Sequence, residues 1–247
     1  MLQSFQLGPL ALPTYPLLLI LGFYLGLFWA ARTAQRRGLD PDHVYNAGFY
    51  AAVAGIIGGR LGHVAFHLPA YAGDPLSILS PNLAAFQPWV ALAAALLLVA
   101  WYIRKHRLPL LPLFDALASG GLLTLVVLAL ADFLNGRHYG SPTVLPWAVF
   151  QWDVARHPVQ LYELAGTLMV ILLLWWRLDR LTPGRGGMAA IAGYAAVRLV
   201  VDAFRAQPVT IGDGFRLSQV IALVVLVLVL LAFYQTSPRN PAHRPQA

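Results

Sequence analysis

The chain has 247 residues, of which 59% are hydrophobic and only 11% are charged, and its mean hydropathy is +0.65. Soluble domains are about 45–50% apolar and about 25% charged, so this composition excludes an ordinary soluble domain and predicts a polytopic helical membrane protein. The formal charge of +7 does not indicate a nucleic-acid partner, because the basic residues follow a membrane topology pattern. The absence of cysteine excludes disulfides, a thiolate nucleophile from the chain itself and a zinc–cysteine site.

The apolar residues fall into seven segments, and a membrane span takes about 20 residues. The sequence therefore predicts an all-α membrane protein, with about seven transmembrane helices around a polar central cavity. We expect a single domain over residues 1–235 and a disordered cytoplasmic tail over 236–247, which is polar and rich in proline. The seven predicted helices are 14–33, 46–67, 87–103, 112–134, 158–177, 188–206 and 215–234.

The basic residues are distributed unevenly between the two ends of these helices. With the N-terminus outside, the outer segments hold four, which are Arg137, Arg156, Arg205 and Arg216. The inner segments hold more basic residues than the outer ones. By the positive-inside rule, this excess predicts an N-terminus outside and a C-terminus in the cytoplasm. The inner segments hold eleven, which are Arg32, Arg36, Arg37, Arg104, Lys105, Arg107, Arg177, Arg180, Arg185, Arg239 and Arg244.

The second predicted helix carries Arg60 within the string Gly58–Gly62. An arginine inside a span costs about 2.5–3.5 kcal/mol on insertion scales, so it faces a partner, a water-filled cavity or an anionic ligand. The glycines let either a lipid headgroup or another helix approach closely, so a phosphate site and a packing role are both open. His63 and His67 have the spacing of a metal pair, but no third ligand is suitably spaced and no metal site is expected.

The fifth predicted helix opens with the polar string Arg156–Glu163. Pro158 suits a first helical turn, and His157, Gln160 and Glu163 follow one side of the helix at intervals of three. Because a helix N-terminus favours anions, this turn suits a phosphate or glycerol headgroup. The alternative is a helix start anchored at the membrane interface, with Glu163 in a buried salt bridge.

The sixth predicted helix carries Arg198, Asp202 and Arg205 on one face, at offsets of four and seven. Asp202 can orient both arginines, whose planar guanidinium groups suit a phosphate better than lysine does. The alternative is a self-neutralising stripe of ion pairs that packs against Glu163 or Asp132.

These strings resemble the prolipoprotein diacylglyceryl transferases, a family of seven-helix enzymes of the bacterial inner membrane. The Gly-Gly-Arg-Leu-Gly string of the family matches Gly58–Gly62. Its His-Pro-Ser-Gln-Leu-Tyr-Glu string matches His157–Glu163, with Val159 in place of the serine. The resemblance spans residues 13–234. Further matches are Arg198, Asp202 (usually glutamate) and Arg205, together with Tyr15, Asn135, Gly136, Gly140 and Gln219.

The chain departs from the family pattern in the third and fourth predicted helices and in the loop that follows them. The segment 87–103 lacks the usual histidine, Ala129 replaces an arginine, Asp132 replaces an asparagine, and Arg137 replaces a glutamate. We expect Arg137 to supply the charge lost at Ala129 by reaching back from the loop, with Asp132 orienting it.

The resemblance implies transfer of the diacylglyceryl group of phosphatidylglycerol to the lipobox cysteine thiol of prolipoproteins. A thioether forms and glycerol phosphate leaves. Arginines in a low-dielectric site stabilise the charge of that leaving group. The attacking thiol has a pKa of about 8.5, so a base or a positive field must raise its thiolate fraction. No cofactor and no nucleic acid are implied, and the partners are the two substrates and membrane lipids.

The resemblance also implies roles for particular residues. We expect His157, Glu163 and Arg198 to be catalytic, with Glu163 or Asp202 orienting His157 or taking the proton. We further expect Arg60, His157, Glu163, Arg198 and Arg205 to face one cavity with Asp132 and Asn135 at its rim. The expected substrate-binding residues are Tyr15, Arg60, Asp132, Asn135, Arg137, Gly140, Gln160, Tyr162, Asp202 and Arg205.

Two other functions remain open on the sequence. One is a related lipid-modifying transferase with another acceptor. The other is a phospholipid-binding or phospholipid-transporting membrane protein without transferase chemistry, which the replaced residues favour. The retained strings at His157–Glu163 and Arg198–Arg205 favour an enzyme.

Overall fold

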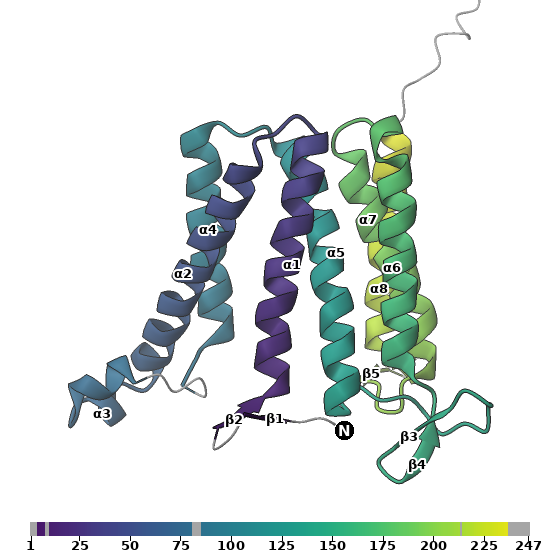
Figure 1. Cartoon of the computed structure of the whole chain (residues 1–247), viewed down its shortest axis with the longest axis horizontal. Coiled ribbons are helices and arrows are strands. Elements are labelled where there is room, and N and C mark those ends of the chain that lie inside the picture. Colours follow the sequence, from purple (N-terminus) through teal and green to yellow (C-terminus); the bar gives the residue numbers. More distant parts are fainter. Residues whose placement is uncertain (1–3, 8–9, 81–84, 213, 237–247) are drawn as a thin grey trace, which may run out of the picture. The chain divides into compact units, whose positions relative to one another are not determined.

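The fold is a set of long helices joined by short hairpins and turns (Figure 1). The computed structural model describes residues 4–7, 10–80, 85–212 and 214–236. Within them, seven helices are long and apolar enough to cross a membrane, which confirms the predicted all-α, multi-pass membrane protein. They are α1 Thr14–Arg36, α2 Pro41–Phe66, α4 Pro88–His106, α5 Leu110–Asn135, α6 Val159–Arg177, α7 Arg185–Val201 and α8 Leu217–Gln235.

The connections contain short elements that the sequence did not predict. One is the short helix α3, Leu68–Tyr71, and three are 3-10 turns: η1 Pro75–Leu79, η2 Leu178–Arg180 and η3 Asp202–Phe204. Three antiparallel hairpins pair β1 Ser4–Leu7 with β2 Leu10–Pro13, β3 Val149–Gln151 with β4 Val154–Arg156, and β5 Thr210–Ile211 with β6 Phe215–Arg216.

Two helices begin three or more residues earlier than the sequence predicted. Helix α2 begins at Pro41 and not at residue 46, because Asp40 caps it by accepting a hydrogen bond from the backbone N–H of Asp42 at 2.9 Å. Pro41 occupies the first turn, where the missing N–H costs nothing. Helix α7 begins at Arg185, directly after Gly184, whose φ of +91° lies in the left-handed region that favours glycine.

The chain forms two compact units, Leu39–Leu110 and the combination of Met1–Gly38 with Leu111–Ala247. The first unit contains α2, α3, η1 and α4, and the second contains the other membrane-spanning helices. The single domain over residues 1–235 therefore stays a prediction. The predicted disordered tail, 236–247, lies outside the described residues from position 237 onward.

Small residues bring α2 and α4 together in the first unit. A Cβ added to Gly62 would lie 2.7 Å from the Cβ of Val90, and one added to Gly58 would lie 2.5 Å from that of Ala94. Both distances are too short for a side chain, so the glycine string has the packing role that the sequence left open.

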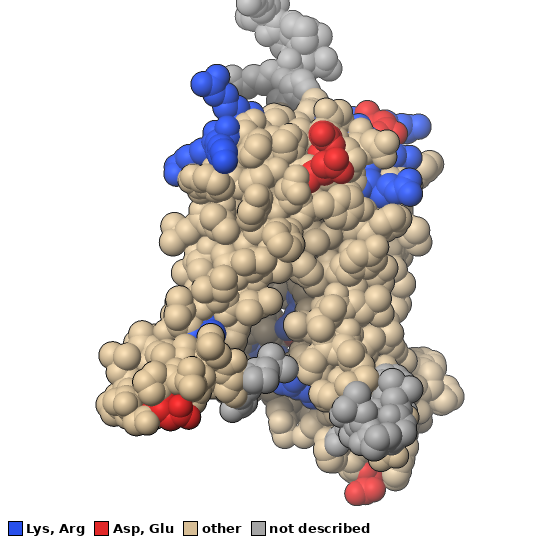
Figure 2. Space-filling model, turned by 60° about the vertical axis from the view of Figure 1, so that its left-hand side comes forward, with Lys and Arg blue, Asp and Glu red and all other residues tan. Residues whose placement is uncertain are grey.

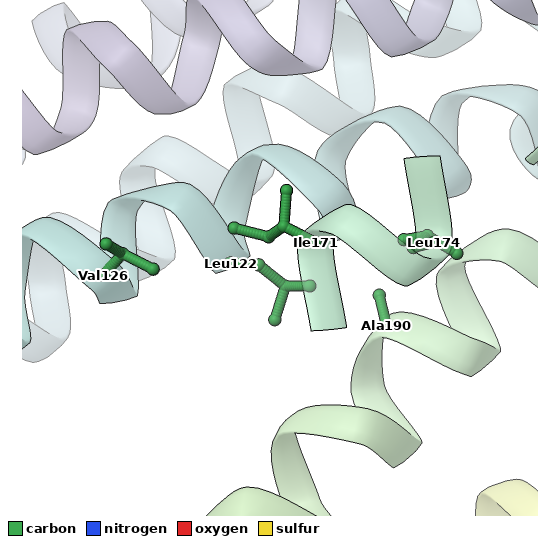
Figure 3. Close-up of a cluster of buried hydrophobic side chains, with 5 residues drawn as sticks. All are labelled: Leu122, Val126, Ile171, Leu174 and Ala190. Carbon is green, nitrogen blue, oxygen red and sulfur yellow. The ribbon is translucent and has the colours of Figure 1, made fainter. Parts of the chain in front are cut away.

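The core of the second unit lies between α5, α6 and α7 (Figure 3). Its buried side chains are Leu122 and Val126 from α5, Ile171 and Leu174 from α6, and Ala190 from α7. Helix α1 packs on α5 near Gly120, where an added Cβ would lie 2.7 Å from the Cβ of Ala30. These contacts fix α1, α5, α6 and α7 relative to one another, and these four helices carry most of the candidate site.

The outer surfaces of the helices suit a lipid environment. On the face that Figure 2 shows, most charged side chains gather toward helix ends, and the middle stretches are mainly uncharged. Large apolar side chains are exposed along these helices, among them Ile20 at 64%, Leu172 at 65% and Leu228 at 60%. A soluble monomer rarely exposes apolar surface on this scale, so lipid contact explains it.

Candidate functional site

Glu163 collects three donors near the start of α6. The Tyr194 hydroxyl donates to its Oε1 at 2.7 Å, and Arg198 Nη1 donates to the same oxygen at 3.2 Å. Arg205 Nη2 donates to Oε2 at 2.5 Å. The residue is only 7% exposed, so these donors compensate a carboxylate that has lost its water.

Asp202 holds the same two arginines from the other side. Arg198 Nη2 lies 2.9 Å from its Oδ2, and Arg205 Nε lies 2.5 Å from its Oδ1. The Asp202 side chain is fully buried. Glu163, Arg198, Asp202 and Arg205 therefore form a closed ring of ion pairs, called the charge cluster below.

The four charges of the cluster cancel, as in the self-neutralising alternative that the sequence offered. Arg216 adds a positive charge beside it, since its Nη1 donates to the backbone carbonyls of Asp202 at 2.5 Å and Arg205 at 3.1 Å. Removing one partner from such a buried pair costs about 3–5 kcal/mol, so the cluster also holds α6 against α7.

His157 lies among aromatic side chains. Its Nδ1 is 3.4 Å from the Tyr162 hydroxyl, and its ring centroid is 5.0 Å from that of Phe204. Trp147 Nε1 donates to the same Tyr162 hydroxyl at 2.8 Å. An indole N–H can only donate, so the hydroxyl proton of Tyr162 is left to point at His157.

The expectation that Glu163 or Asp202 orients His157 does not match these contacts. Within the described part of the chain, no hydrogen bond joins His157 to either carboxylate, and its side-chain partner is Tyr162. The physical reason is that both carboxylates are already occupied by Arg198 and Arg205.

Arg137 lies at the carboxy-terminal end of α5, with its guanidinium 4.6 Å from the centroid of the Tyr15 ring at the start of α1. Among the described residues, no carboxylate lies within ion-pair distance of it. Arg137 is also exposed. It therefore differs from Arg198 and Arg205, because its charge is balanced by an aromatic face and not by an acid.

Asp132 pairs with His138, whose Nδ1 lies 2.9 Å from Oδ2. We had expected the Asp132 carboxylate to orient the side chain of Arg137. The structure corrects this, because the carboxylate contacts His138 instead. The two residues Asp132 and Arg137 meet only through their backbones, where the Arg137 N–H donates to the Asp132 carbonyl at 2.8 Å. That bond closes the end of α5 and leaves the Arg137 side chain free to turn toward Tyr15.

Gln160 and Asn135 bond to nearby backbone. Gln160 Nε2 donates to the Arg137 carbonyl at 2.7 Å, which ties the start of α6 to the end of α5. Asn135 Nδ2 donates to the Ala131 carbonyl one turn earlier at 2.9 Å. The Oε1 of Gln160 is buried and has no hydrogen-bond partner among the described residues.

Gly140 is required for a close approach of two loops. A Cβ there would collide with the backbone carbonyl of His157 and lie 2.8 Å from its Cβ. Gly140 also forms an antiparallel bridge with Arg205. A side chain at this position would therefore displace His157 and disturb the backbone next to Arg205 of the charge cluster.

Two cavities adjoin the charge cluster. A cavity of about 330 Å³ between α7 and α8 is bounded by Tyr194 and Arg198 at its polar end and is otherwise mostly apolar, with Ile191, Ile221 and Val225 in its lining. A smaller one of about 100 Å³ is lined by His138, Tyr139, Arg205 and Gln207. The first suits a hydrocarbon chain and the second a small polar group.

Arg60 belongs to the other compact unit and is engaged there. Its Nε donates to the carbonyl of Ile78 at 2.8 Å, Nη2 to that of Ser77 at 2.7 Å, and Nη1 to that of Ala85 at 2.9 Å. The first two bonds tie the turn η1 to α2, and in all three a backbone carbonyl accepts from the guanidinium. A place for Arg60 in the same cavity as Arg198 stays a prediction.

His63 and His67 stack at 4.2 Å between ring centroids, with an angle of 18° between the rings. Stacked rings direct their nitrogen lone pairs side by side and not toward a common point. Within the described ranges, no group of three or more histidine, aspartate or glutamate residues is placed to hold a metal ion.

The sequence reasoning gave no role to Tyr194, Trp147, His138 or Arg216, although each contacts a candidate site residue. Tyr194 had a signal, because it lies one helical turn before Arg198 and so shares its face. For Trp147 and Arg216 the sequence carries no such signal, because the conformation of the loops brings them to their partners.

Comparisons with known proteins show the family of the chain. The sequence model of the prolipoprotein diacylglyceryl transferase family matches residues 3–235. The chain is similar to the phosphatidylglycerol–prolipoprotein diacylglyceryl transferase of Corynebacterium diphtheriae, with 29% identity over 93% of this chain and 90% of that protein. The proteins of the same name from Rhodospirillum centenum and Sinorhizobium medicae are 31% and 32% identical, over 98% and 84% of this chain and 93% and 80% of their own lengths. The chain, whose described part contains seven helices long and apolar enough to cross a membrane, belongs to the prolipoprotein diacylglyceryl transferase family.

Proposed function

We propose that this protein transfers the diacylglyceryl group of phosphatidylglycerol to the lipobox cysteine thiol of prolipoproteins, at the outer face of the bacterial inner membrane. The sulfur forms a bond to the glyceryl carbon while the bond from that carbon to the phosphate oxygen breaks. Glycerol phosphate leaves with the bonding electrons, and the thiol proton passes to a base. Family membership and the names of the relatives support this activity.

The observation that carries the proposal is the contrast between Arg137 and the charge cluster. Arg198 and Arg205 are bound by Glu163 and Asp202, whereas Arg137 faces Tyr15 without a carboxylate. An anionic headgroup bound at Arg137 displaces no existing ion pair. The leaving phosphate gains charge as the carbon–oxygen bond breaks, and a positioned arginine stabilises that charge more than the starting lipid.

The charge cluster then has a positioning role. It fixes Arg198 at the polar end of the α7–α8 cavity, whose volume of about 330 Å³ suits part of an acyl chain. The lipid glycerol backbone would lie between this cavity and Arg137. The buried, unpartnered Oε1 of Gln160 offers an acceptor to a hydroxyl of the headgroup.

His157 is the proposed base for the thiol. Its hydrogen bond to Tyr162 is long at 3.4 Å, which is typical of a catalytic contact before the substrate arrives. If Tyr162 donates to Nδ1, then Nε2 carries the proton in the resting tautomer. Proton uptake from the thiol then requires the Tyr162 hydroxyl to turn away from Nδ1 toward another acceptor.

A second function is favoured by two observations. The charge cluster is electrically closed and Ala129 lacks the family arginine, so the chain could bind phosphatidylglycerol without transferring it. Both functions predict binding of the lipid, and only the first predicts a thioether product.

The deciding experiment is complementation of a bacterial strain depleted of its own diacylglyceryl transferase. If the protein is a transferase, its expression restores growth, and lipoproteins shift from the unmodified to the lipid-modified mobility on a gel. The matched control is the His157→Ala variant, expressed to the same level in the membrane. Lack of any lipoprotein shift with correctly inserted wild-type protein would favour the non-catalytic lipid-binding function.

A further inference from the structure

A basic groove lies between α1 and α6, far from the charge cluster. Its volume is about 390 Å³, and it is lined by Phe28, Trp29, Arg32, Gln35 and Arg36 of α1 together with Trp175 of α6. None of these residues has a role in the proposed transfer reaction. The groove combines two arginines with three aromatic side chains.

The aromatic side chains form a rigid floor. The rings of Trp29 and Trp175 are 4.7 Å apart between centroids. Arg36 lies over Trp175 at 3.7 Å, and its Nη1 donates to the Trp175 backbone carbonyl at 3.0 Å. These two contacts hold the Arg36 guanidinium in place near the end of α6.

The groove carries an excess of positive charge. Asp179 is the carboxylate within reach of Arg36, but it lies 3.8 Å away and its side chain is 70% exposed, so the pair is weak. In the described part of the chain, no carboxylate lies within ion-pair distance of Arg32, whose guanidinium is 5.1 Å from the Phe28 ring centroid. An anion in the groove would therefore meet two incompletely compensated guanidinium groups.

The groove residues lie near the carboxy-terminal ends of α1 and α6, whereas the candidate site lies near the starts of these helices. The groove therefore faces the opposite leaflet from the candidate site. Tyr15 and Arg36 stand near the two ends of α1, and at 1.5 Å per residue they are about 32 Å apart along the helix. The hydrocarbon core of a bilayer is about 30 Å thick. Arg32 and Arg36 thus lie at headgroup depth on the side away from Tyr15.

The helix faces next to the groove remain apolar and exposed. Tyr24, one turn from Phe28, is 62% exposed, and Leu21 is 45% exposed. On α6, Leu172 is one turn from Trp175 and is 65% exposed. A ligand that fills the groove and covers these side chains needs an anionic head and hydrocarbon tails.

We propose that the α1–α6 groove binds a phospholipid with an anionic headgroup from the leaflet opposite the candidate site, with its acyl chains along Leu21, Tyr24 and Leu172. Arg32 and Arg36 receive the phosphate, and the two tryptophans support the glycerol region, where aromatic rings favour the membrane interface. This lipid is a structural ligand and not the donor of the reaction, so the proposal is independent of the proposed function.

Photocrosslinking tests this site on the full-length protein in nanodiscs of phosphatidylcholine. Two probes carry a diazirine on an acyl chain close to the glycerol, one a phosphatidylglycerol and the other a phosphatidylcholine. Peptide mapping separates labelling of α1 and α6 near Arg36 and Trp175 from labelling near Tyr15. We expect the phosphatidylglycerol probe to label the groove peptides about tenfold more strongly. Both headgroups carry a phosphate, but the choline cation cancels its charge in phosphatidylcholine, so only phosphatidylglycerol brings a net negative charge to Arg32 and Arg36.

The charge-removing variant is R32Q/R36Q, and the matched control is R177Q/R180Q, which removes the same charge at the same end of α6 outside the groove. We expect the first to lower labelling to the phosphatidylcholine level and the second to leave it unchanged. Equal labelling by both probes, or labelling that survives R32Q/R36Q, would overturn the proposal.

Competition keeps the test valid if R32Q/R36Q fails to fold. On the unaltered protein, excess unlabelled phosphatidylglycerol should suppress groove labelling, whereas excess phosphatidylcholine should not. Suppression by both lipids, or by neither, would show that the headgroup charge is not recognised. Equal suppression by soluble glycerol phosphate would show that the site takes the anion without its lipid, which also contradicts the proposal.

Discussion

At the scale of single residues, the site separates two kinds of arginine. Arg198 and Arg205 each form ion pairs with two carboxylates, which neutralise their charge within the fold. Arg137 is exposed and lies against the Tyr15 ring. The first kind fixes geometry, and the second is available to an anionic substrate. Loss of Arg137 should therefore affect activity, whereas loss of a carboxylate in the charge cluster should affect stability.

Arg137→Ala should lower diacylglyceryl transfer by about 100-fold or more, the usual cost of removing one donor from a developing negative charge. The measurement is thioether formation on a lipobox peptide with phosphatidylglycerol vesicles. The matched control is Arg177→Ala, which should retain full activity. Arg177 is an exposed arginine at the carboxy-terminal end of α6, away from the charge cluster. Unchanged transfer by the Arg137→Ala protein would show that this residue does not compensate for the arginine missing at Ala129.

Glu163→Gln should lower stability, because Arg198 and Arg205 keep their charges while losing one shared partner. A cost of about 3–5 kcal/mol corresponds to a fall of about 6–20 °C in melting temperature for a chain of this size. Asp179→Asn is the control: it removes an exposed carboxylate 3.8 Å from Arg36 and should shift melting by little. Similar melting of all three proteins in detergent would contradict a stabilising role for the cluster.

At the scale of elements, the sequence predicted the seven spans well because each is a long apolar run. It placed the start of α2 too late, although Asp40 and Pro41 give a recognisable helix start. The charge cluster was only partly predictable. Offsets of four and seven put Arg198, Asp202 and Arg205 on one face, but the contacts of Glu163 with Arg198 and Arg205 depend on how α6 packs against α7.

Contacts made by loop residues could not be predicted from the helical periodicity of the sequence. Trp147 reaches Tyr162 through a hairpin connection, and His138 reaches Asp132 from the residues that follow α5. His138 has a φ of +52°, and the hairpin turn at Trp152 and Asp153 has φ values of 54° and 58°. Only a few per cent of non-glycine residues adopt this conformation, even though histidine and aspartate adopt it more often than most, so a single sequence does not predict it at these positions.

Two neighbouring glycines in α5 give a sharp test of helix packing. A Cβ on Gly120 would lie 2.7 Å from the Cβ of Ala30, whereas one on Gly121 meets nothing within 4 Å. Gly120→Ala should therefore push α1 from α5 and cost about 1–3 kcal/mol. Gly121→Ala should be neutral or stabilise by about 0.5–1 kcal/mol, since alanine favours a helix. The measurement is thermal melting in detergent, and equal melting of both variants would show that α1 does not pack on α5 in this way.

At the scale of the whole molecule, charge and polarity are divided between the two ends of the helices. The charge cluster, Arg137 and His157 lie where α1 and α6 begin and where α5 and α7 end. Arg32, Arg36, Arg37 and Arg177 lie at the opposite ends of α1 and α6. The positive-inside rule predicts that these latter ends face the cytoplasm, and we therefore expect the candidate site at the outer surface, where exported prolipoproteins would arrive.

The absence of native cysteine allows this orientation to be measured directly, because a single introduced thiol is the sole target of a maleimide. Val144 is fully exposed in the connection between α5 and α6, and Asp179, with a side chain 70% exposed, follows the far end of α6. In intact spheroplasts, a membrane-impermeant maleimide should label the Val144→Cys protein at once and the Asp179→Cys protein only after permeabilisation. The reverse pattern would place the N-terminus in the cytoplasm and the candidate site on the inner surface, where a lipobox cysteine awaiting modification after export could not reach it. Reporter fusions after Arg37, Arg107 and Arg185 provide an independent check, since all three should report the cytoplasm.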